Sequence, residues 1–219
     1  MPQEVFISGA TGYLGRALTA ALLLRGHRVL ALARPAAAAR VPAGAKVVIG
    51  DALVAQSFSA AVPRACCFVH LIGTPHPGPA KAAEFQRVDL LSVQQATRAA
   101  RAAGVAHFVC LSVAQPAPVM HAYVAARAAG EAVVRASGLC ATLVRPWYVL
   151  GPGHRWPLLL LPIYALARCI PGSRDTAMRL GLVTLTQMTR ALVAVIEAPG
   201  GRGDARVIEV PEIRALAAT

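Results

Sequence analysis

The sequence has almost no lysine and few acidic or aromatic residues. Of its 22 basic residues only Lys46 and Lys81 are lysines, and the others are arginines. The sequence has 10 acidic residues, so its formal net charge is +12. The arginines are spread singly or in loose pairs, without the basic cluster and interleaved aromatic residues of a nucleic-acid site. We therefore interpret the charge as a solvated basic surface and predict no nucleic-acid partner, although some arginines can serve a phosphorylated ligand.

Long apolar runs and metal-ligand spacings are also missing. The longest uncharged apolar run, residues 156–167, contains two prolines and is shorter than the roughly 20 residues that cross a bilayer. The five cysteines have no metal-ligand spacing, and His70 has no second ligand near it in sequence. The first residues lead into a strand pattern and not into a signal peptide. We expect no transmembrane segment, no metal, free thiols and a cytoplasmic location.

Short apolar runs alternate with stretches whose apolar residues recur at helical spacing. Hydrophobic residues make up 56% of the 219 residues, enough to bury a substantial core. The predicted strands cover residues 5–8, 28–33, 46–49, 67–72, 108–112 and 141–145, and the predicted helices 13–25, 84–103 and 122–137. Continuous apolar strands that alternate with helices predict an α/β fold with a doubly wound parallel sheet, covered by helices on both faces.

The composition changes after residue 150. The region 151–219 is rich in Pro, Gly and Leu, with one late helix predicted over 187–197 and a final strand over 206–210. We expect residues 1–150 to form a dinucleotide-binding domain, because a glycine-rich loop at residues 9–15 follows its first predicted strand. Residues 151–219 are expected to form a small C-terminal cap for the substrate, within the same compact unit, over the strand ends where such sheets bind ligands.

Three glycines follow the first predicted strand and open the first predicted helix. Gly9 permits a tight turn, Gly12 lets backbone N–H groups approach a pyrophosphate, and Gly15 lets helix and strand pack closely. The helix N-terminus attracts the phosphates. We predict that this loop binds a dinucleotide, with further contacts from Thr11, Tyr13 and Leu14.

The end of the second strand bears on which dinucleotide is bound. NAD sites carry an acidic residue there, whereas this strand ends at Arg34, and Arg40 follows a few residues later. A guanidinium can engage a 2′-phosphate with two hydrogen bonds. We predict NADP(H), with NAD(H) as the alternative; Arg34 could instead stack on the adenine or face solvent.

The glycine spacing G-x-x-G-x-x-G resembles that of the atypical short-chain dehydrogenase/reductase superfamily. Further motifs extend the resemblance over most of the chain: GD at 50–51, HLIGT at 70–74, GVAHFVCLS at 104–112, Y-x-x-x-R at 123–127 and LVRPWYVLGPG at 143–153. Within the superfamily the chain is most similar to NmrA-like and NDUFA9-like proteins. The resemblance implies a Rossmann fold, with further cofactor contacts from Asp51, Ala52, Leu71, Ile72, Gly73, Pro146, Trp147, Tyr148 and Val149. Asp51 fits a loop cap nearly as well.

The same resemblance implies a catalytic group of Ser112, Tyr123 and Arg127. A serine polarises the substrate oxygen, and a tyrosine transfers a proton with help from a cation four residues later, on the same helix face. This sequence departs from the pattern twice, with Arg127 in place of lysine and Asp89 in place of asparagine.

The sequence thus predicts an NADP(H)-dependent oxidoreductase acting on a small carbonyl or alcohol, as a monomer or homodimer. The substrate pocket is expected to include Trp147, Tyr148 and Trp156. The departures at Arg127 and Asp89 favour an alternative, a non-catalytic NAD(P)-binding redox sensor or assembly subunit. A nucleotide-sugar epimerase or dehydratase is disfavoured, because the roughly 70 residues after the sixth strand leave little room for such a substrate.

Overall fold

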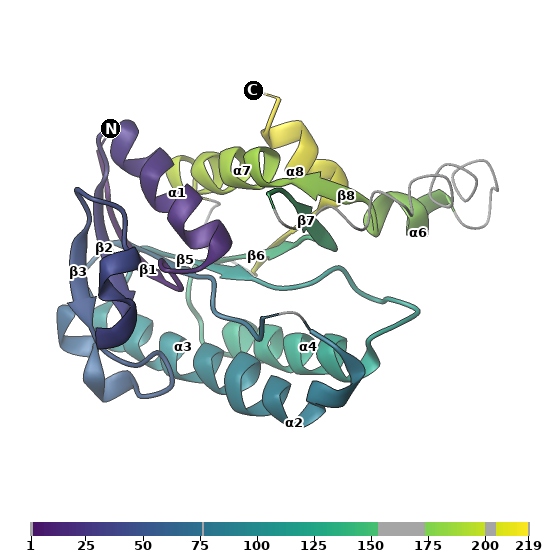
Figure 1. The fold of residues 1–219 in the computed structure, drawn as a ribbon, viewed down its shortest axis with the longest axis horizontal. Coiled ribbons are helices and arrows are strands. Elements are labelled where there is room, and N and C mark those ends of the chain that lie inside the picture. Colours follow the sequence, from purple (N-terminus) through teal and green to yellow (C-terminus); the bar gives the residue numbers. More distant parts are fainter. Residues whose placement is uncertain (1, 76, 153–173, 200–204, 219) are drawn as a thin grey trace.

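A seven-stranded sheet runs through the centre of the molecule (Figure 1). The computed structural model describes residues 2–75, 77–152, 174–199 and 205–218. The strand order is β3-β2-β1-β4-β5-β6-β9, and every pairing in this sheet is parallel. The strands are β1 (Glu4–Ser8), β2 (Arg28–Ala33), β3 (Lys46–Ile49), β4 (Cys67–His70), β5 (His107–Leu111), β6 (Ala141–Arg145) and β9 (Arg206–Glu209).

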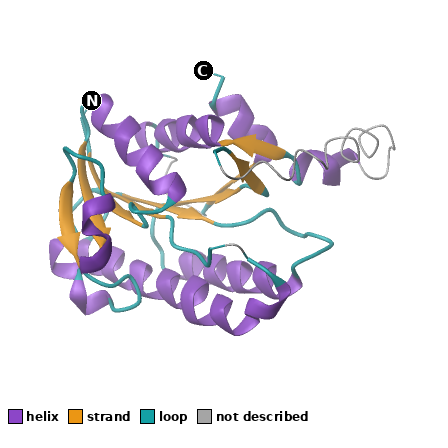
Figure 2. Ribbon diagram, viewed as in Figure 1, coloured by secondary structure: helices purple, strands orange, loops and turns teal. Residues whose placement is uncertain are grey.

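Helices cover both faces of the sheet (Figure 2). One layer holds α1 (Tyr13–Leu24), α7 (Leu185–Glu197) and α8 (Val210–Leu216). The other holds α2 (Ala82–Glu84), the π-helical turn η5 (Phe85–Leu90), α3 (Leu91–Ala103) and α4 (His121–Ala136). Short 3₁₀ turns, η1 (Pro35–Arg40), η2 (Ala55–Ser57), η3 (Ser59–Ala61) and η4 (Pro79–Lys81), lie in the connections. The predicted doubly wound parallel sheet is confirmed.

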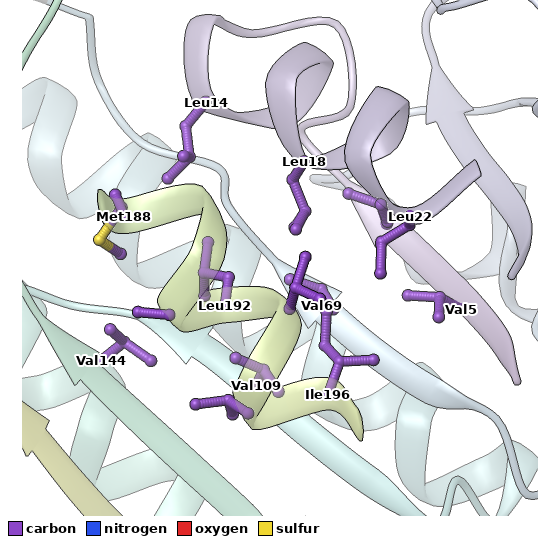
Figure 3. Close-up of a cluster of buried hydrophobic side chains, with 14 of the residues drawn as sticks. Val5, Leu14, Leu18, Leu22, Val69, Val109, Val144, Met188, Leu192 and Ile196 are labelled. Atoms are coloured by element: carbon purple, nitrogen blue, oxygen red, sulfur yellow. The ribbon is translucent and has the colours of Figure 1, made fainter. Parts of the chain in front are cut away.

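The core on the α1 side is built from matching apolar faces (Figure 3). Leu14, Leu18 and Leu22 recur every four residues on α1 and so form one stripe. They meet valines of the sheet and a similar stripe of α7 that includes Leu192 and Ile196. Each fully buried side chain of this kind contributes about 1.5–3 kcal/mol.

Aromatic rings and alanines fill the opposite core. Phe6, Phe68 and Phe108 of three neighbouring strands lie side by side, with ring centres 4.9 and 5.3 Å apart. Small residues such as Ala96 and Ala100 on α3 face them. Because alanine side chains are short, the helix can approach the sheet closely enough to cover these rings.

The C-terminal part of the chain joins the main body. The predicted late helix and final strand are present as α7 and β9, and β9 pairs with β6. Two short strands, β7 (Tyr148–Leu150) and β8 (Leu182–Thr184), form a separate parallel pair, and α6 spans Arg174–Arg179. The substrate-binding role of residues 151–219 stays a prediction, because residues 153–173 lie outside the described residues, as do the predictions for Trp156 and Cys169. Among the helices described, none is long and apolar enough to cross a membrane.

Candidate functional site

The glycine loop connects β1 to α1 with little space around its backbone. Gly9 has a φ of +90°, and a Cβ there would lie 2.9 Å from the carbonyl carbon of Leu71. A Cβ on Gly15 would lie 2.1 Å from the carbonyl oxygen of Gly9. Gly12 precedes the first turn of α1 and donates its N–H to the Gly9 oxygen at 3.0 Å. The turn and the close packing expected of Gly9 and Gly15 are therefore present, and the binding of a pyrophosphate at Gly12 stays a prediction.

A groove of about 370 Å³ opens beside this loop. It lies where the strand order reverses between β1 and β4, the position at which doubly wound sheets bind nucleotides. The groove brings together seven of the predicted cofactor contacts: Gly9, Thr11, Arg34, Asp51, Ala52, Ile72 and Gly73. Glu84 and Val88 also line it, and the sequence did not single them out.

The two arginines that follow β2 occupy different places. Arg34 is exposed and lines the groove, whereas Arg40 is exposed at the end of η1 and is absent from the groove lining. Asp51 lines the groove as well, but its Oδ1 accepts the Leu53 N–H at 2.9 Å. Asp51 therefore caps its loop, and its contact with a cofactor stays a prediction.

The remaining predicted cofactor contacts lie outside this groove lining. Leu14, Leu71 and Val149 belong to or pack against the α1-side core. A Cβ on Gly151 would lie 1.4 Å from the phenol oxygen of Tyr13, so Tyr13 reaches from the loop to the end of β7. Pro146, Trp147 and Tyr148 connect β6 with β7. Their contacts with a cofactor or substrate stay predictions.

Tyr123 and Arg127 project from the first turns of α4, as their spacing predicts. The guanidinium carbon of Arg127 lies 5.3 Å from the centre of the Tyr123 ring. Phe85 of η5 packs edge-on against the same ring, at 5.1 Å between ring centres. Tyr123 is half-buried between these two neighbours.

The two departures from the family pattern form a buried ion pair. Arg127 Nη2 lies 2.8 Å from Asp89 Oδ1, and the two side chains are only 5% and 0% exposed. Burial by itself would lower the pKa of Arg127, but the phenol of Tyr123 and the carboxylate of Asp89 raise it above its usual value. The substitutions that the sequence presents as separate anomalies are thus partners in one contact.

Ser112 also meets a buried carboxylate. Its hydroxyl donates to Glu131 Oε1 at 2.6 Å, and Arg145 Nε donates to the same oxygen at 2.7 Å. Burial would raise the pKa of Glu131, but the hydrogen bonds from Arg145 and Ser112 bring it below its usual value. Among the described contacts none joins Ser112 to Tyr123. Glu131 was missed, although its position eight residues after Tyr123 places it on the same face of α4.

Comparison with known proteins identifies the family. Residues 9–154 match the model of a family described as NAD(P)H-binding. The chain belongs to this NAD(P)H-binding family. It is 33% identical over 197 residues to a ceramide reductase of Caulobacter vibrioides, which covers 89% of this chain and 61% of that protein. It is 39% identical over 121 residues to a chloroplastic divinyl chlorophyllide a 8-vinyl-reductase of Zea mays, covering 49% of this chain and 29% of the relative. The chain thus spans less than two thirds of either.

A solved structure supports the fold at greater sequence distance. A short-chain dehydrogenase/reductase superfamily protein from Agrobacterium tumefaciens, with bound NAD, superposes with a TM-score of 0.67 at 19% identity. The match covers 97% of this chain and 82% of the other. The likeness confirms the fold that the resemblance to the short-chain dehydrogenase/reductase superfamily implies.

Closely packed glycines and a buried histidine surround the turn from β1 to α1 in this NAD(P)H-binding protein. The close contacts at Gly9 and Gly15 hold the loop against the start of α1, and backbone N–H groups at a helix start are a common phosphate-binding site. His70 lies beneath this site, between the hydroxyls of Ser8 at 2.8 Å and Ser92 at 3.2 Å. Burial, together with the charge of Arg127, lowers the pKa of His70 to about 3, so it is a neutral core histidine.

The described cysteines take no part in this site. Within the described residues, Cys66, Cys67, Cys110 and Cys140 form no disulfide. Burial raises the pKa of Cys66 to about 11 and that of Cys110 to about 12, which makes both poor nucleophiles at neutral pH. Within the described part of the chain no group of three or more metal-ligating side chains comes together.

Proposed function

We propose that this NAD(P)H-binding protein is an NADP(H)-dependent oxidoreductase that reduces a small carbonyl compound with NADPH, or oxidises the corresponding alcohol with NADP+. The observation that carries the cofactor preference is Arg34, an exposed guanidinium on the groove at the end of β2. A 2′-phosphate suits a guanidinium, whereas NAD sites place a carboxylate at this point. The names of both relatives, ceramide reductase and vinyl reductase, support a reductive reaction.

The chain's own residues divide the work between binding and proton transfer. When bound, the nicotinamide cofactor supplies the hydride. In the groove, the glycine loop would hold the pyrophosphate, Arg34 the 2′-phosphate and Asp51 the adenosine. Tyr123 would donate a proton to the substrate oxygen as the carbonyl becomes an alcohol. Trp147 and Tyr148, which connect β6 with β7, would contact the substrate.

A second candidate is a protein that holds NADP(H) without chemistry, as a redox sensor or assembly subunit. The observation that favours it is that two of the three predicted catalytic side chains already bind carboxylates. Ser112 donates to Glu131, and Arg127 is paired with Asp89. Tyr123 is then the one member of that group with no carboxylate partner among the described contacts. The cytoplasmic location and the choice between monomer and homodimer stay predictions.

Replacing Tyr123 by phenylalanine distinguishes the two candidates. The purified protein is given NADPH and a panel of aldehydes, ketones and quinones, and NADPH oxidation is followed by absorbance. We expect turnover by the wild type and a loss of about 10²-fold or more in kcat in Tyr123→Phe, because the proton donor is gone. The dissociation constant for NADPH should stay within about twofold, because the ring remains in contact with Phe85 and Arg127.

Two outcomes contradict the reductase. Micromolar NADPH binding without turnover of any substrate in the panel favours the cofactor-holding protein. Turnover that survives in Tyr123→Phe removes Tyr123 from the mechanism and leaves the reductase without its proposed proton donor.

A further inference from the structure

The ion pair between Asp89 and Arg127 is bonded far more extensively than a charge pair requires. Arg127 Nη1 donates to the carbonyl oxygen of Leu111 at 2.9 Å and to that of Ile72 at 3.2 Å. These carbonyls lie at the ends of β5 and just beyond β4. Asp89 Oδ2 accepts the Thr74 hydroxyl at 2.6 Å and the Thr74 N–H at 3.2 Å. One ion pair therefore ties together two strand ends and η5.

The segments that the pair ties together form one wall of the groove. Ile72 and Gly73 line the groove, and Thr74, which Asp89 holds, follows them directly. Val88 also lines the groove, while Asp89, the next residue of η5, is buried behind it. π-helical turns are often found at functional sites. In η5, Val88 lines the groove, and the next residue, Asp89, makes the buried hydrogen bonds and the ion pair.

Gly73 shows how closely the guanidinium fits behind the wall. A Cβ at this position would lie 2.0 Å from Arg127 Nη2 and 3.2 Å from Asp89 Oδ1. The guanidinium thus occupies the space that any other side chain would need. Arg127 is therefore packed directly against the Ile72–Thr74 backbone.

We propose that Arg127 and Asp89 act as a positioning pair that fixes the Ile72–Thr74 wall of the cofactor groove. Arg127 is only 5% exposed and its Nη1 and Nη2 atoms donate to protein acceptors, so in this proposal it does not bind the cofactor directly. The planar guanidinium reaches Asp89 and two backbone carbonyls at once. Cofactor affinity then depends on this branched geometry as well as on the positive charge. This inference rests on the proposed cofactor site.

Arg127→Lys tests the fork while keeping the charge. A lysine ammonium is a compact point charge and cannot reproduce all three contacts at once. We expect the dissociation constant for NADPH to rise by about tenfold or more, the scale of effect seen when a supporting hydrogen-bond shell is removed. If Arg127 instead bound the cofactor directly, as the family's lysine is expected to do, Arg127→Lys would bind NADPH as well as the wild type or better.

A neutral double variant, Asp89→Asn with Arg127→Gln, removes both charges without leaving either one buried and alone. The amide hydrogen exchange of Thr74 is measured in the cofactor-free proteins by NMR, alongside NADPH binding and thermal unfolding. We expect faster exchange at Thr74 and weaker NADPH binding in a folded protein. Arg135→Gln is the matched control, because it breaks an ion pair further along α4 that lies outside the groove lining. Arg135→Gln should change neither the exchange of the Thr74 amide nor NADPH binding.

Each result has a defined meaning. If the amide of Thr74 exchanges no faster in the double variant, the positioning pair does not fix the Ile72–Thr74 wall. If the Thr74 amide exchanges faster but NADPH affinity is unchanged, the wall is fixed by the pair but does not contribute to cofactor binding. If the double variant does not fold, Arg127→Lys supplies both readouts. A wild type that binds neither NADPH nor NADH contradicts the proposed function. The exchange of the Thr74 amide then still tests whether Arg127 and Asp89 fix the Ile72–Thr74 wall.

Discussion

At the scale of single residues, position relative to the groove separates side chains that the sequence cannot tell apart. Arg34 and Arg40 are both exposed arginines after β2, and both are predicted to bind the 2′-phosphate. Only Arg34 belongs to the groove lining. Spacing along the chain could not reveal this, because the η1 turn between them determines where the second guanidinium goes.

Arg34→Gln should therefore weaken NADPH binding by about tenfold, because a charge-assisted contact to the 2′-phosphate contributes about 1.5 kcal/mol or more. NADH binding should change little, since NADH has no 2′-phosphate. Both constants can be measured from cofactor fluorescence. Arg40→Gln is the matched control and should leave both nearly unchanged; equal effects of the two substitutions would show that bulk surface charge, and not Arg34, attracts the cofactor.

The contact between the buried residues Asp89 and Arg127 could not be predicted from the sequence either. Asp89 and Arg127 stand out in the sequence only by comparison with a family pattern, and nothing in their 38-residue separation indicates that they touch. The roles of Gly9 and Gly15 were predictable, because a tight turn and the close packing of helix and strand are needed in any strand–loop–helix unit of this kind.

At the scale of elements, long amphipathic segments were predictable and three-residue strands were not. The predicted strand 67–72 ends at His70 in the structure, and Ile72, two residues beyond that end, lines the groove. β7 and β8 were missed, since such short strands carry no recognisable alternation. The start of α7 lies two residues before the predicted one, at a capping box between Thr184 and Gln187.

That capping box gives a prediction for α7. Thr184→Ala should lower the free energy of unfolding by about 1 kcal/mol, because the N–H of Gln187 loses its side-chain acceptor at the helix start. Urea denaturation measures the change. Thr186→Ala is the control, since Thr186 is exposed within the first turn and alanine is the better helix former. A Thr184→Ala protein as stable as the wild type would mean that packing against α1 alone sets the start of α7.

At the scale of the whole molecule, buried histidines couple folding to acid pH. Burial lowers the pKa of His70 to about 3 and, with the charge of Arg206, that of His107 to about 4. In the unfolded chain both return to about 6.5, so the unfolded state binds more protons below that pH. Stability is therefore full above about pH 6.5 and falls as the pH drops toward 4.

We expect the free energy of unfolding to decrease by up to about 1.4 kcal/mol per pH unit for each of the two histidines. Urea titrations between pH 7 and pH 5 check this, above the range in which carboxylates such as Glu131 titrate. His107→Gln should make the dependence less steep. A free energy of unfolding that stays constant over this range would contradict the burial of neutral imidazoles.

The pairing of α1 with α7 sets an order of events during synthesis. Arg25 at the end of α1 binds Glu197 at the end of α7 across 172 residues, and the leucine stripe of α1 is buried against α7. At roughly 5–20 residues per second a ribosome needs about 10–30 s to cover that distance. During that time the apolar face of α1 has no partner helix, although the glycine loop beside it is already complete. The first βα unit therefore reaches its native packing only after the residues of α7 have emerged.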